Sequence, residues 1–132
     1  MSSKIIQEGE ALIYIPVEKK ISKKLPVFYN PVMKANRDIS ILLLNAIKRN
    51  HLQIALPLAG TGIRGIRFLL ELKKKKIKHL YFNDYLDKST SLIKKNIKKN
   101  KLSTKNISIS TKDANKFMVD STGFDYIDID PF

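Results

Sequence analysis

Residues 52–67 read Leu-Gln-Ile-Ala-Leu-Pro-Leu-Ala-Gly-Thr-Gly-Ile-Arg-Gly-Ile-Arg, and this stretch decides the fold. Its apolar first part, Leu52 to Leu58, is typical of a buried strand, with Pro57 limiting the ladder near the strand end. The glycines at positions 60, 62 and 65 then form a turn into a helix that we expect to run to about Glu71. A buried strand followed by a glycine turn and a helix indicates an α/β protein.

The rest of the chain repeats this alternation. Strands are expected over residues 77–83, 107–110 and 124–130, and helices over residues 87–97 and 114–119. Such alternation implies right-handed crossovers and a parallel sheet. Lysines 73–76 are expected to close the helix after the glycine turn, because basic side chains suit its negative carboxyl end.

Two segments without this alternation come first. Residues 4–16 alternate around Gln7-Glu8-Gly9-Glu10, as a β-hairpin does. Residues 25–31 place prolines around Phe28 and Tyr29, which predicts a stiff extended arm. We therefore expect an amino-terminal hairpin and arm over residues 1–35 and a partial α/β domain over residues 36–132.

A helix is predicted to begin near Asn36, where Asn36 or Asp38 can cap it. Its apolar residues recur at three- and four-residue steps, which is the spacing of a helix: Ile39, Leu42, Leu43, Ala46 and Ile47. Lys48-Arg49-Asn50 then ends it.

Composition narrows the class of protein. A chain of 132 residues with 43% apolar residues is long enough for one domain with a core. The absence of cysteine, with only two histidines, excludes disulfides and the usual zinc sites, so no metal is expected. No apolar run approaches the roughly 20 residues of a membrane span, and no signal-peptide pattern opens the chain, so a cytoplasmic protein without a membrane partner is expected.

The net charge of +13 favours polyanions, with nucleic acid as the first candidate. The alternative, that the positive charge only coats solvated helix faces, has about equal weight. All but four of the 25 basic residues are lysine, which often coats solvated helix faces, whereas arginine is the usual bidentate phosphate reader.

Three polar features follow strand ends: the glycine turn, Asp84 and Asp113. In a doubly wound sheet all three lie at the same edge. An acid about 20 residues after the turn suits a ribose diol, and Asp113 with the backbone of Ala114 suits an adenine edge. The sequence therefore predicts a nucleoside site.

The glycine spacing fits a dinucleotide-binding turn only loosely, so a nicotinamide-dependent oxidoreductase has weak support. Arg64 and Arg67 at this turn suit a ligand that carries a carboxylate and no pyrophosphate, such as S-adenosylmethionine. The alternative is ordinary charge on a helix surface. A further acid, Asp130, ends the strand 127–130 before Pro131 and Phe132; an Asp-Pro pair is also an ordinary way for a strand to enter a turn.

In this order, five segments resemble the signature of the tRNA (guanine-26-N2)-dimethyltransferases: Pro26–Asp38, Thr61–Phe68, Asn83-Asp84, Asp113–Asn115 and Ile127–Phe132. The resemblance spans nearly the whole chain. It implies a class I methyltransferase fold, with a Rossmann-like parallel sheet, and N2,N2-dimethylguanine in tRNA as the product.

The resemblance also implies residue roles. The residues expected to contact S-adenosylmethionine are Arg37, Arg64, Asp84, Asp113 and Ala114, and Asp130 is expected to act on the target base. Phe28 and Phe132 are candidates to stack on an extruded base, although phenylalanines often only pack.

The chain departs from the family in two ways. Leu56-Pro57-Leu58 stands where the family usually has an acid near the end of the first strand. The family also continues after the Asp-Pro-Phe motif with three more strands and a tRNA-engaged domain, so the class I order 3-2-1-4-5-7-6 would leave strand four as an open edge. We expect the cofactor-binding part of a split or truncated enzyme that needs a second polypeptide; the alternative is a basic RNA-binding module that does not catalyse.

Overall fold

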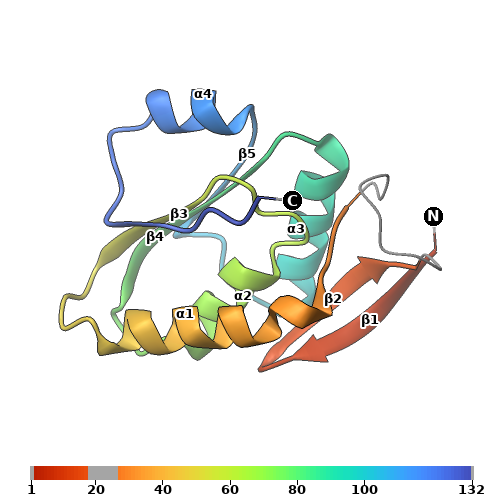
Figure 1. The fold of residues 1–132 in the computed structure, drawn as a ribbon, viewed down its shortest axis with the longest axis horizontal. Helices are drawn as coiled ribbons and strands as arrows, with labels where there is room; N and C mark the ends of the chain where they lie inside the picture. Colours follow the sequence, from red (N-terminus) through yellow and green to blue (C-terminus); the bar gives the residue numbers. More distant parts are fainter. Residues whose placement is uncertain (1, 18–26, 132) are drawn as a thin grey trace.

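The computed structural model describes residues 2–17 and 27–131. A two-stranded antiparallel hairpin and a four-stranded parallel sheet hold the strands (Figure 1). The elements, in chain order, are β1 (Ser3–Glu8), β2 (Ala11–Pro16), the 3-10 helix η1 (Pro31–Met33), α1 (Lys34–Ala46), β3 (Leu52–Leu56), α2 (Ile63–Glu71), β4 (Ile77–Asp84), α3 (Asp87–Lys99), β5 (Ile107–Thr111), α4 (Ala114–Val119) and β6 (Tyr126–Ile127). The α/β prediction and the amino-terminal hairpin are confirmed.

The parallel sheet has the order β5-β4-β3-β6, which is the predicted order 3-2-1-4. β4 pairs along most of its length, with Leu56 opposite Phe82 and Asp84 opposite Thr111. β6 is much shorter than the predicted strand 124–130, because it pairs only with Ile54 and Ala55 before β3 itself ends.

Helices lie on both faces of the sheet (Figure 1). On one face, Phe68 of α2 meets Tyr126 of β6 edge to face, at 6.3 Å between ring centroids. On the other, Phe117 of α4 stacks on Phe124, which meets Tyr81 of β4. Each sheet face therefore has its own aromatic contact with a helix or its flanking loop.

Gly65 lets α2 lie directly on the sheet. A Cβ at this position would clash with the Phe82 ring and with Leu56 Cδ1. Both partners are packed core side chains, so neither can move away cheaply. This requirement accounts for the third glycine of the turn.

The hairpin is part of the same core as the sheet. Ile13 and Ile15 are buried in one cluster with residues of α2 and β3. Asn96 of α3 and Asn100, which directly follows α3, take the place of a neighbouring strand for β2. Asn96 bonds the N–H and the C=O of Tyr14, at 2.7 and 3.2 Å, and Asn100 does the same for Leu12, at 2.9 and 2.7 Å. The free backbone edge of β2 is thereby satisfied.

Helix α1 is confirmed, but it begins at Lys34, and neither Asn36 nor Asp38 caps it, because η1 leads straight into its first turn. Its buried residues are Arg37, Ser40, Ile41 and Leu44. The apolar residues that revealed the helix point outward instead: Ile39, Leu42 and Leu43 are 63%, 68% and 52% exposed.

The prediction that lysines 73–76 close α2 is wrong. The last turn of α2 holds no basic residue, and the helix ends at Glu71. Lys76 is buried and donates from Nζ to the backbone carbonyls of Ile47 and Arg49, so it ties down the loop before β3. No helix in residues 2–17 or 27–131 has the length and apolar character needed to cross a membrane.

Candidate functional site

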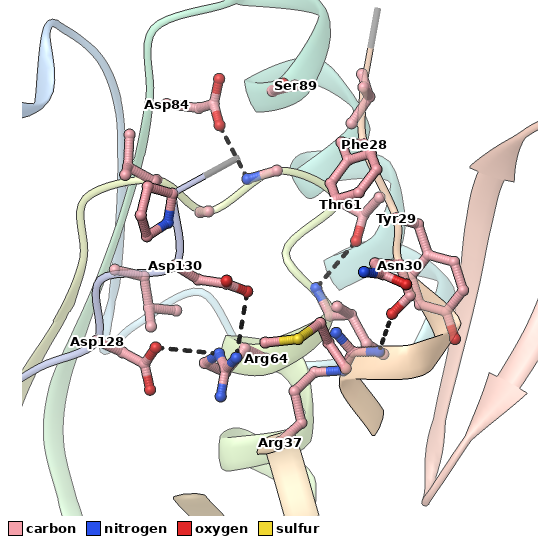
Figure 2. Close-up of a pocket in the computed structure, with 18 of the residues that line it drawn as sticks. Phe28, Tyr29, Asn30, Arg37, Thr61, Arg64, Asp84, Ser89, Asp128 and Asp130 are labelled. Carbon is pink, nitrogen blue, oxygen red and sulfur yellow. Dashed lines mark hydrogen bonds and ion pairs between the residues drawn. The ribbon is translucent and has the colours of Figure 1, made fainter. Parts of the chain in front are cut away.

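A cavity of about 520 Å³ lies at the carboxyl ends of β3, β4 and β6. Figure 2 shows the side chains that face it from the arm, α1, the glycine turn and these strand ends. Its volume is within the range of about 300–1,000 Å³ that is usual for small-molecule sites. Five predicted site residues line it together: Phe28, Arg37, Arg64, Asp84 and Asp130.

Asp113 and Ala114 do not line this cavity. Asp113 is exposed at the start of α4, where its Oδ1 accepts a hydrogen bond of 3.0 Å from the Lys116 N–H. Its carboxylate therefore serves as a helix cap. Phe132 lies outside the described residues.

The glycine turn brings the backbone to the cavity. Gly60 and Gly62 have φ values of +56° and +80°, a left-handed conformation that favours glycine. Gly62 directly precedes α2. The Gly60 N–H donates to Asp84 Oδ2 at 2.9 Å, so the turn is fixed to the end of β4 (Figure 2).

Asp84 joins two loops. Besides the bond from Gly60, its Oδ1 accepts one of 3.1 Å from the Leu86 N–H before α3. A carboxylate has about four lone-pair sites, so both oxygens keep acceptor capacity toward the cavity. A ribose diol, which offers two hydroxyl donors, fits this group.

Asn83 supports Asp84 from within the sheet, a role that the sequence analysis did not predict. Its side chain is fully buried, donates to the carbonyls of Pro57 and Lys112 at 3.0 and 2.9 Å, and accepts from Ser110 Oγ at 2.7 Å. These bonds hold the ends of three neighbouring strands in register. A polar residue in the last positions of a buried strand is the only sequence signal for it.

The Arg64 cluster consists of Arg64, Ser40, Asn36, Asp128 and Asp130. The guanidinium donates to Ser40 Oγ and Asn36 Oδ1, both at 2.8 Å, from its two terminal nitrogens. It also pairs with Asp128 through Nε at 3.2 Å and with Asp130 through Nη2 at 3.3 Å (Figure 2). One buried arginine thus orients both acids of the Asp-x-Asp-Pro segment.

The two acids differ in exposure. The Asp128 side chain is 11% exposed, whereas that of Asp130 is 38% exposed. Burial raises the pKa of Asp128, although Arg64 and a 3.1 Å hydrogen bond from the Tyr126 hydroxyl oppose that rise. Both acids line the cavity, and Asp130 is the more exposed of the two. The sequence predicts no role for Asp128, because only the fold shows that it shares Arg64 with Asp130.

Arg37 lines the cavity but is strongly bound within the protein. Its Nε and Nη2 donate to Glu8 at 2.8 and 2.6 Å, and Nη2 also donates to the Asn30 carbonyl at 2.9 Å. The residue is 3% exposed. A contact between Arg37 and a cofactor stays a prediction.

The fold is that of class I methyltransferases. A solved structure of Trm1 from Pyrococcus horikoshii with S-adenosyl-L-methionine superposes with a TM-score of 0.80 at 37% identity, over 98% of this chain and 36% of that one. Methanocaldococcus jannaschii Trm5 in complex with adenosine, at 18% identity and a TM-score of 0.74, shares the fold.

The family model for N2,N2-dimethylguanosine tRNA methyltransferase matches residues 5–132, and the chain belongs to this family. A tRNA (guanine(26)-N(2)/guanine(27)-N(2))-dimethyltransferase of Aquifex aeolicus is 40% identical over 97% of the chain. The corresponding guanine(26) enzyme of Sulfurisphaera tokodaii is 42% identical over 96%. The chain spans 34% of the length of each, about a third.

Proposed function

We propose that this chain is the cofactor-binding part of an S-adenosylmethionine-dependent methyltransferase that modifies the exocyclic N2 of guanine in tRNA, at position 26. One observation carries the proposal: the glycine turn, Asp84 and Asp130 line a single cavity at the strand ends. Membership of the family and the likeness to a structure solved with S-adenosylmethionine support it.

The groups around the cavity fit this cofactor. Asp84 has acceptor capacity for the ribose, and the glycine turn lets a ligand approach the backbone closely. One arginine against two carboxylates gives the Arg64 cluster a formal excess of negative charge, which suits a sulfonium cation. Leu56 and Leu58, from the segment that stands where the family usually has an acid, also line the cavity.

Asp130 is the proposed acceptor for the base. When bound, the cofactor supplies an electrophilic methyl group. The guanine amino group is a poor nucleophile because its lone pair is delocalised into the ring, so a carboxylate that accepts its hydrogen bond and its proton assists attack. Arg64, bonded to Asp130 at 3.3 Å, keeps that carboxylate directed along the cavity. Phe28, on the opposite wall, is the proposed stacking partner of the extruded base.

Calorimetric titration with S-adenosylmethionine tests the cofactor proposal. We expect one binding site, weakened about tenfold or more in Asp84→Asn, which loses a charge-assisted acceptor. Asp120→Asn is the matched control, because Asp120 is an exposed acid whose ion pairs within the described part of the chain are with Lys112 and Lys116, on or near α4. No binding by the parent chain, or equal affinities of parent and Asp84→Asn, would refute the proposal.

The part of the relatives that this chain does not span is proposed to dock beside β6. Of the described strands, only β3 pairs with β6, and Ile129 just beyond it is 65% exposed. The proposed docking surface also includes the exposed Ile39 and Leu42 of α1. Further strands along β6 would cover an edge that otherwise invites pairing.

A second polypeptide is the proposed source of that part. The test mixes the chain with the purified carboxy-terminal portion of a relative and measures methyl transfer to tRNA. Activity that needs both components supports it. Full activity of the 132-residue chain alone would contradict a requirement for a second polypeptide.

A basic RNA-binding module is the second candidate. The exposed lysines 94, 95, 98 and 99 of α3 form no ion pair with an acid among the residues described. Binding of tRNA that Asp84→Ala leaves unchanged, by a parent chain that binds no S-adenosylmethionine, would favour this candidate. The acids gathered at the cavity count against it, since a binder of polyanions gains nothing from them.

A further inference from the structure

The amino-terminal hairpin reaches the wall of the cavity through one buried carboxylate. Glu8, the last residue of β1, is 3% exposed. It accepts hydrogen bonds from Arg37 Nε and Nη2 at 2.8 and 2.6 Å, from Arg67 Nη1 at 3.1 Å and from the Tyr29 hydroxyl at 3.0 Å. We call Glu8, Tyr29, Arg37 and Arg67 the Glu8 cluster.

The cluster fixes the segment that carries Phe28. Tyr29 is held at its hydroxyl by Glu8, and the next carbonyl, that of Asn30, accepts a 2.9 Å bond from Arg37. The Arg37 guanidinium also lies 5.3 Å from the centre of the Tyr29 ring. Phe28, Tyr29, Asn30 and Arg37 all line the cavity, so one wall of the site depends on bonds to Glu8.

The hairpin itself is firmly seated on α2. Gly9, next to Glu8, has φ +55°, and a Cβ there would lie 2.5 Å from Glu71 Oε2 and 2.7 Å from Arg67 Nε. Glu71 in turn accepts two bonds from Arg67, at 2.7 and 2.9 Å. The tight contact leaves Glu8 little freedom to move away from the two arginines.

Removing the charge of Glu8 would leave two buried guanidinium groups close together without their shared acceptor. Arg67 keeps Glu71 and Asp38, at 2.7 Å each, whereas Glu8 is the only side-chain acceptor of Arg37 among the described residues. Without the charge of Glu8, Arg37 and the arm are therefore no longer held in place.

We propose that Glu8 is a positioning residue of the cofactor site: through Arg37 and Tyr29 it holds the arm 27–30 against the glycine turn, and so sets the affinity for the nucleoside ligand. This inference rests on the proposed function for the identity of the ligand. Its geometric part, the control of the arm by Glu8, stands independently of that identity.

The experiment compares Glu8→Gln with Glu71→Gln in the full 132-residue chain. Both changes take one carboxylate from Arg67, but only Glu8 reaches Arg37 and Tyr29. Three quantities are measured where both variants are folded: the Nε–H NMR signal of Arg37, amide hydrogen exchange in residues 27–33, and the dissociation constant of S-adenosylmethionine.

In Glu8→Gln we expect the Arg37 Nε–H signal to shift and broaden, exchange in the arm to accelerate, and the dissociation constant to rise about tenfold, the effect of losing one charge-assisted bond. In Glu71→Gln the Arg37 Nε–H signal and exchange in the arm stay as in the parent, and the dissociation constant changes less than about twofold. Tyr29→Phe, which removes a single hydroxyl donor, should accelerate exchange in the arm even if Glu8→Gln does not fold.

Unchanged exchange in the arm of Glu8→Gln and Tyr29→Phe would overturn the inference. Equal losses of affinity in Glu8→Gln and Glu71→Gln would also overturn it, because they would indicate a general loss of stability. A parent chain that binds no S-adenosylmethionine would refute the proposed function, while the NMR and exchange measurements still decide whether Glu8 positions the arm.

Discussion

The Glu8 cluster and the Arg64 cluster are built from the same two chemical groups in opposite proportion. In the first, one carboxylate faces the two arginines Arg37 and Arg67. In the second, one arginine faces the two carboxylates of Asp128 and Asp130. Both lie beside the same cavity, and α1 contributes to both.

The number of arginines per carboxylate accounts for the opposite pKa shifts of Glu8 and Asp128. Burial of Glu8 raises its pKa, but hydrogen bonds and charge from Arg37, with Tyr29 and Arg67, outweigh that effect and hold the pKa below its ordinary value. Burial raises the pKa of Asp128, and there a single arginine, shared with Asp130, does not reverse it. The arginine-rich cluster thus favours the ionised form of Glu8, whereas the acid-rich cluster raises the pKa of Asp128.

Truncation of Glu8 is expected to have the largest effect on stability. Glu8→Ala leaves two buried arginines without their shared acceptor, which costs roughly 3–5 kcal/mol of the free energy of unfolding. Urea denaturation measures it. Asp38→Asn is the control: Asp38 also pairs with Arg67, at 2.7 Å, but its side chain is 38% exposed, so the loss should stay within about 1 kcal/mol. Similar losses in both variants would contradict the distinction.

Ser40→Ala tests how much an uncharged side chain contributes to the acid-rich cluster. Ser40 of α1 accepts at Oγ a 2.8 Å hydrogen bond from Arg64 Nη1. Removing this bond should lower the free energy of unfolding by about 1–2 kcal/mol, as expected for a hydrogen bond to a buried charged group. Ser91→Ala, at an exposed position of α3, should change the unfolding free energy by less than about 0.5 kcal/mol. A loss no larger than that of Ser91→Ala would show that Ser40 adds nothing to the hold that Asn36 and the two acids have on Arg64.

The two clusters should give stability opposite dependences on pH. Glu8 has a pKa below its unfolded value of 4.5, so its contribution is present above that value and disappears as pH falls through the folded pKa. Asp128 has a pKa above its unfolded value of 3.8, so the folded state binds the proton more tightly, and stability falls as pH rises from 3.8 through the folded pKa.

Denaturant unfolding over the acidic range checks both signs. The stability difference between the parent and Glu8→Gln should shrink as the solution becomes more acidic. For Asp128→Asn, the variant should gain relative to the parent as pH rises from 3.8, by up to about 1.4 kcal/mol per unit of pKa displacement. Slopes of the same sign for the two variants would contradict the comparison.

Much of the frame could be predicted from sequence because it depends on local patterns. The glycine turn predicted that a helix follows β3. The positions of Asp84 and Asp130 at strand ends predicted that the two acids lie at the same edge of the sheet, where they line one cavity. The same rule placed Asp113 at that edge but could not give its distance from the cavity. An aspartate just before a helix also has a local partner, and here it bonds its own helix, to the Lys116 N–H.

Long-range charge pairing was beyond the reach of sequence. Gln7-Glu8-Gly9-Glu10 reads as a polar turn, and nothing local marks Glu8 as buried against Arg37, 29 residues away, or Arg67, 59 residues away. Lys76 was misinterpreted for the same reason: in a run of lysines, only the fold distinguishes the buried one from its exposed neighbours. Burial of a charged group depends on partners that tertiary structure supplies.

Helix α1 shows that helical spacing of residues predicts a helix but not which of its faces is buried. Arg37, Ser40, Ile41 and Leu44 have helical spacing, and so do Ile39, Leu42, Leu43 and Ala46. The more polar of the two stripes faces inward because it serves both clusters, Arg37 in one and Ser40 in the other.

The smallest predicted effect tests that orientation directly. Leu42 is 68% exposed, so Leu42→Ser should change the free energy of unfolding of this chain by no more than about 0.5 kcal/mol. Leu44→Ala, two residues on and fully buried, should cost about 2–5 kcal/mol through lost burial and a cavity. Thermal and urea unfolding of the two variants measure the contrast. Because the outer stripe of α1 belongs to the surface proposed to accept the rest of the enzyme, Leu42→Ser should also weaken binding of a relative's carboxy-terminal portion, an effect that a purely solvent-facing leucine would not produce.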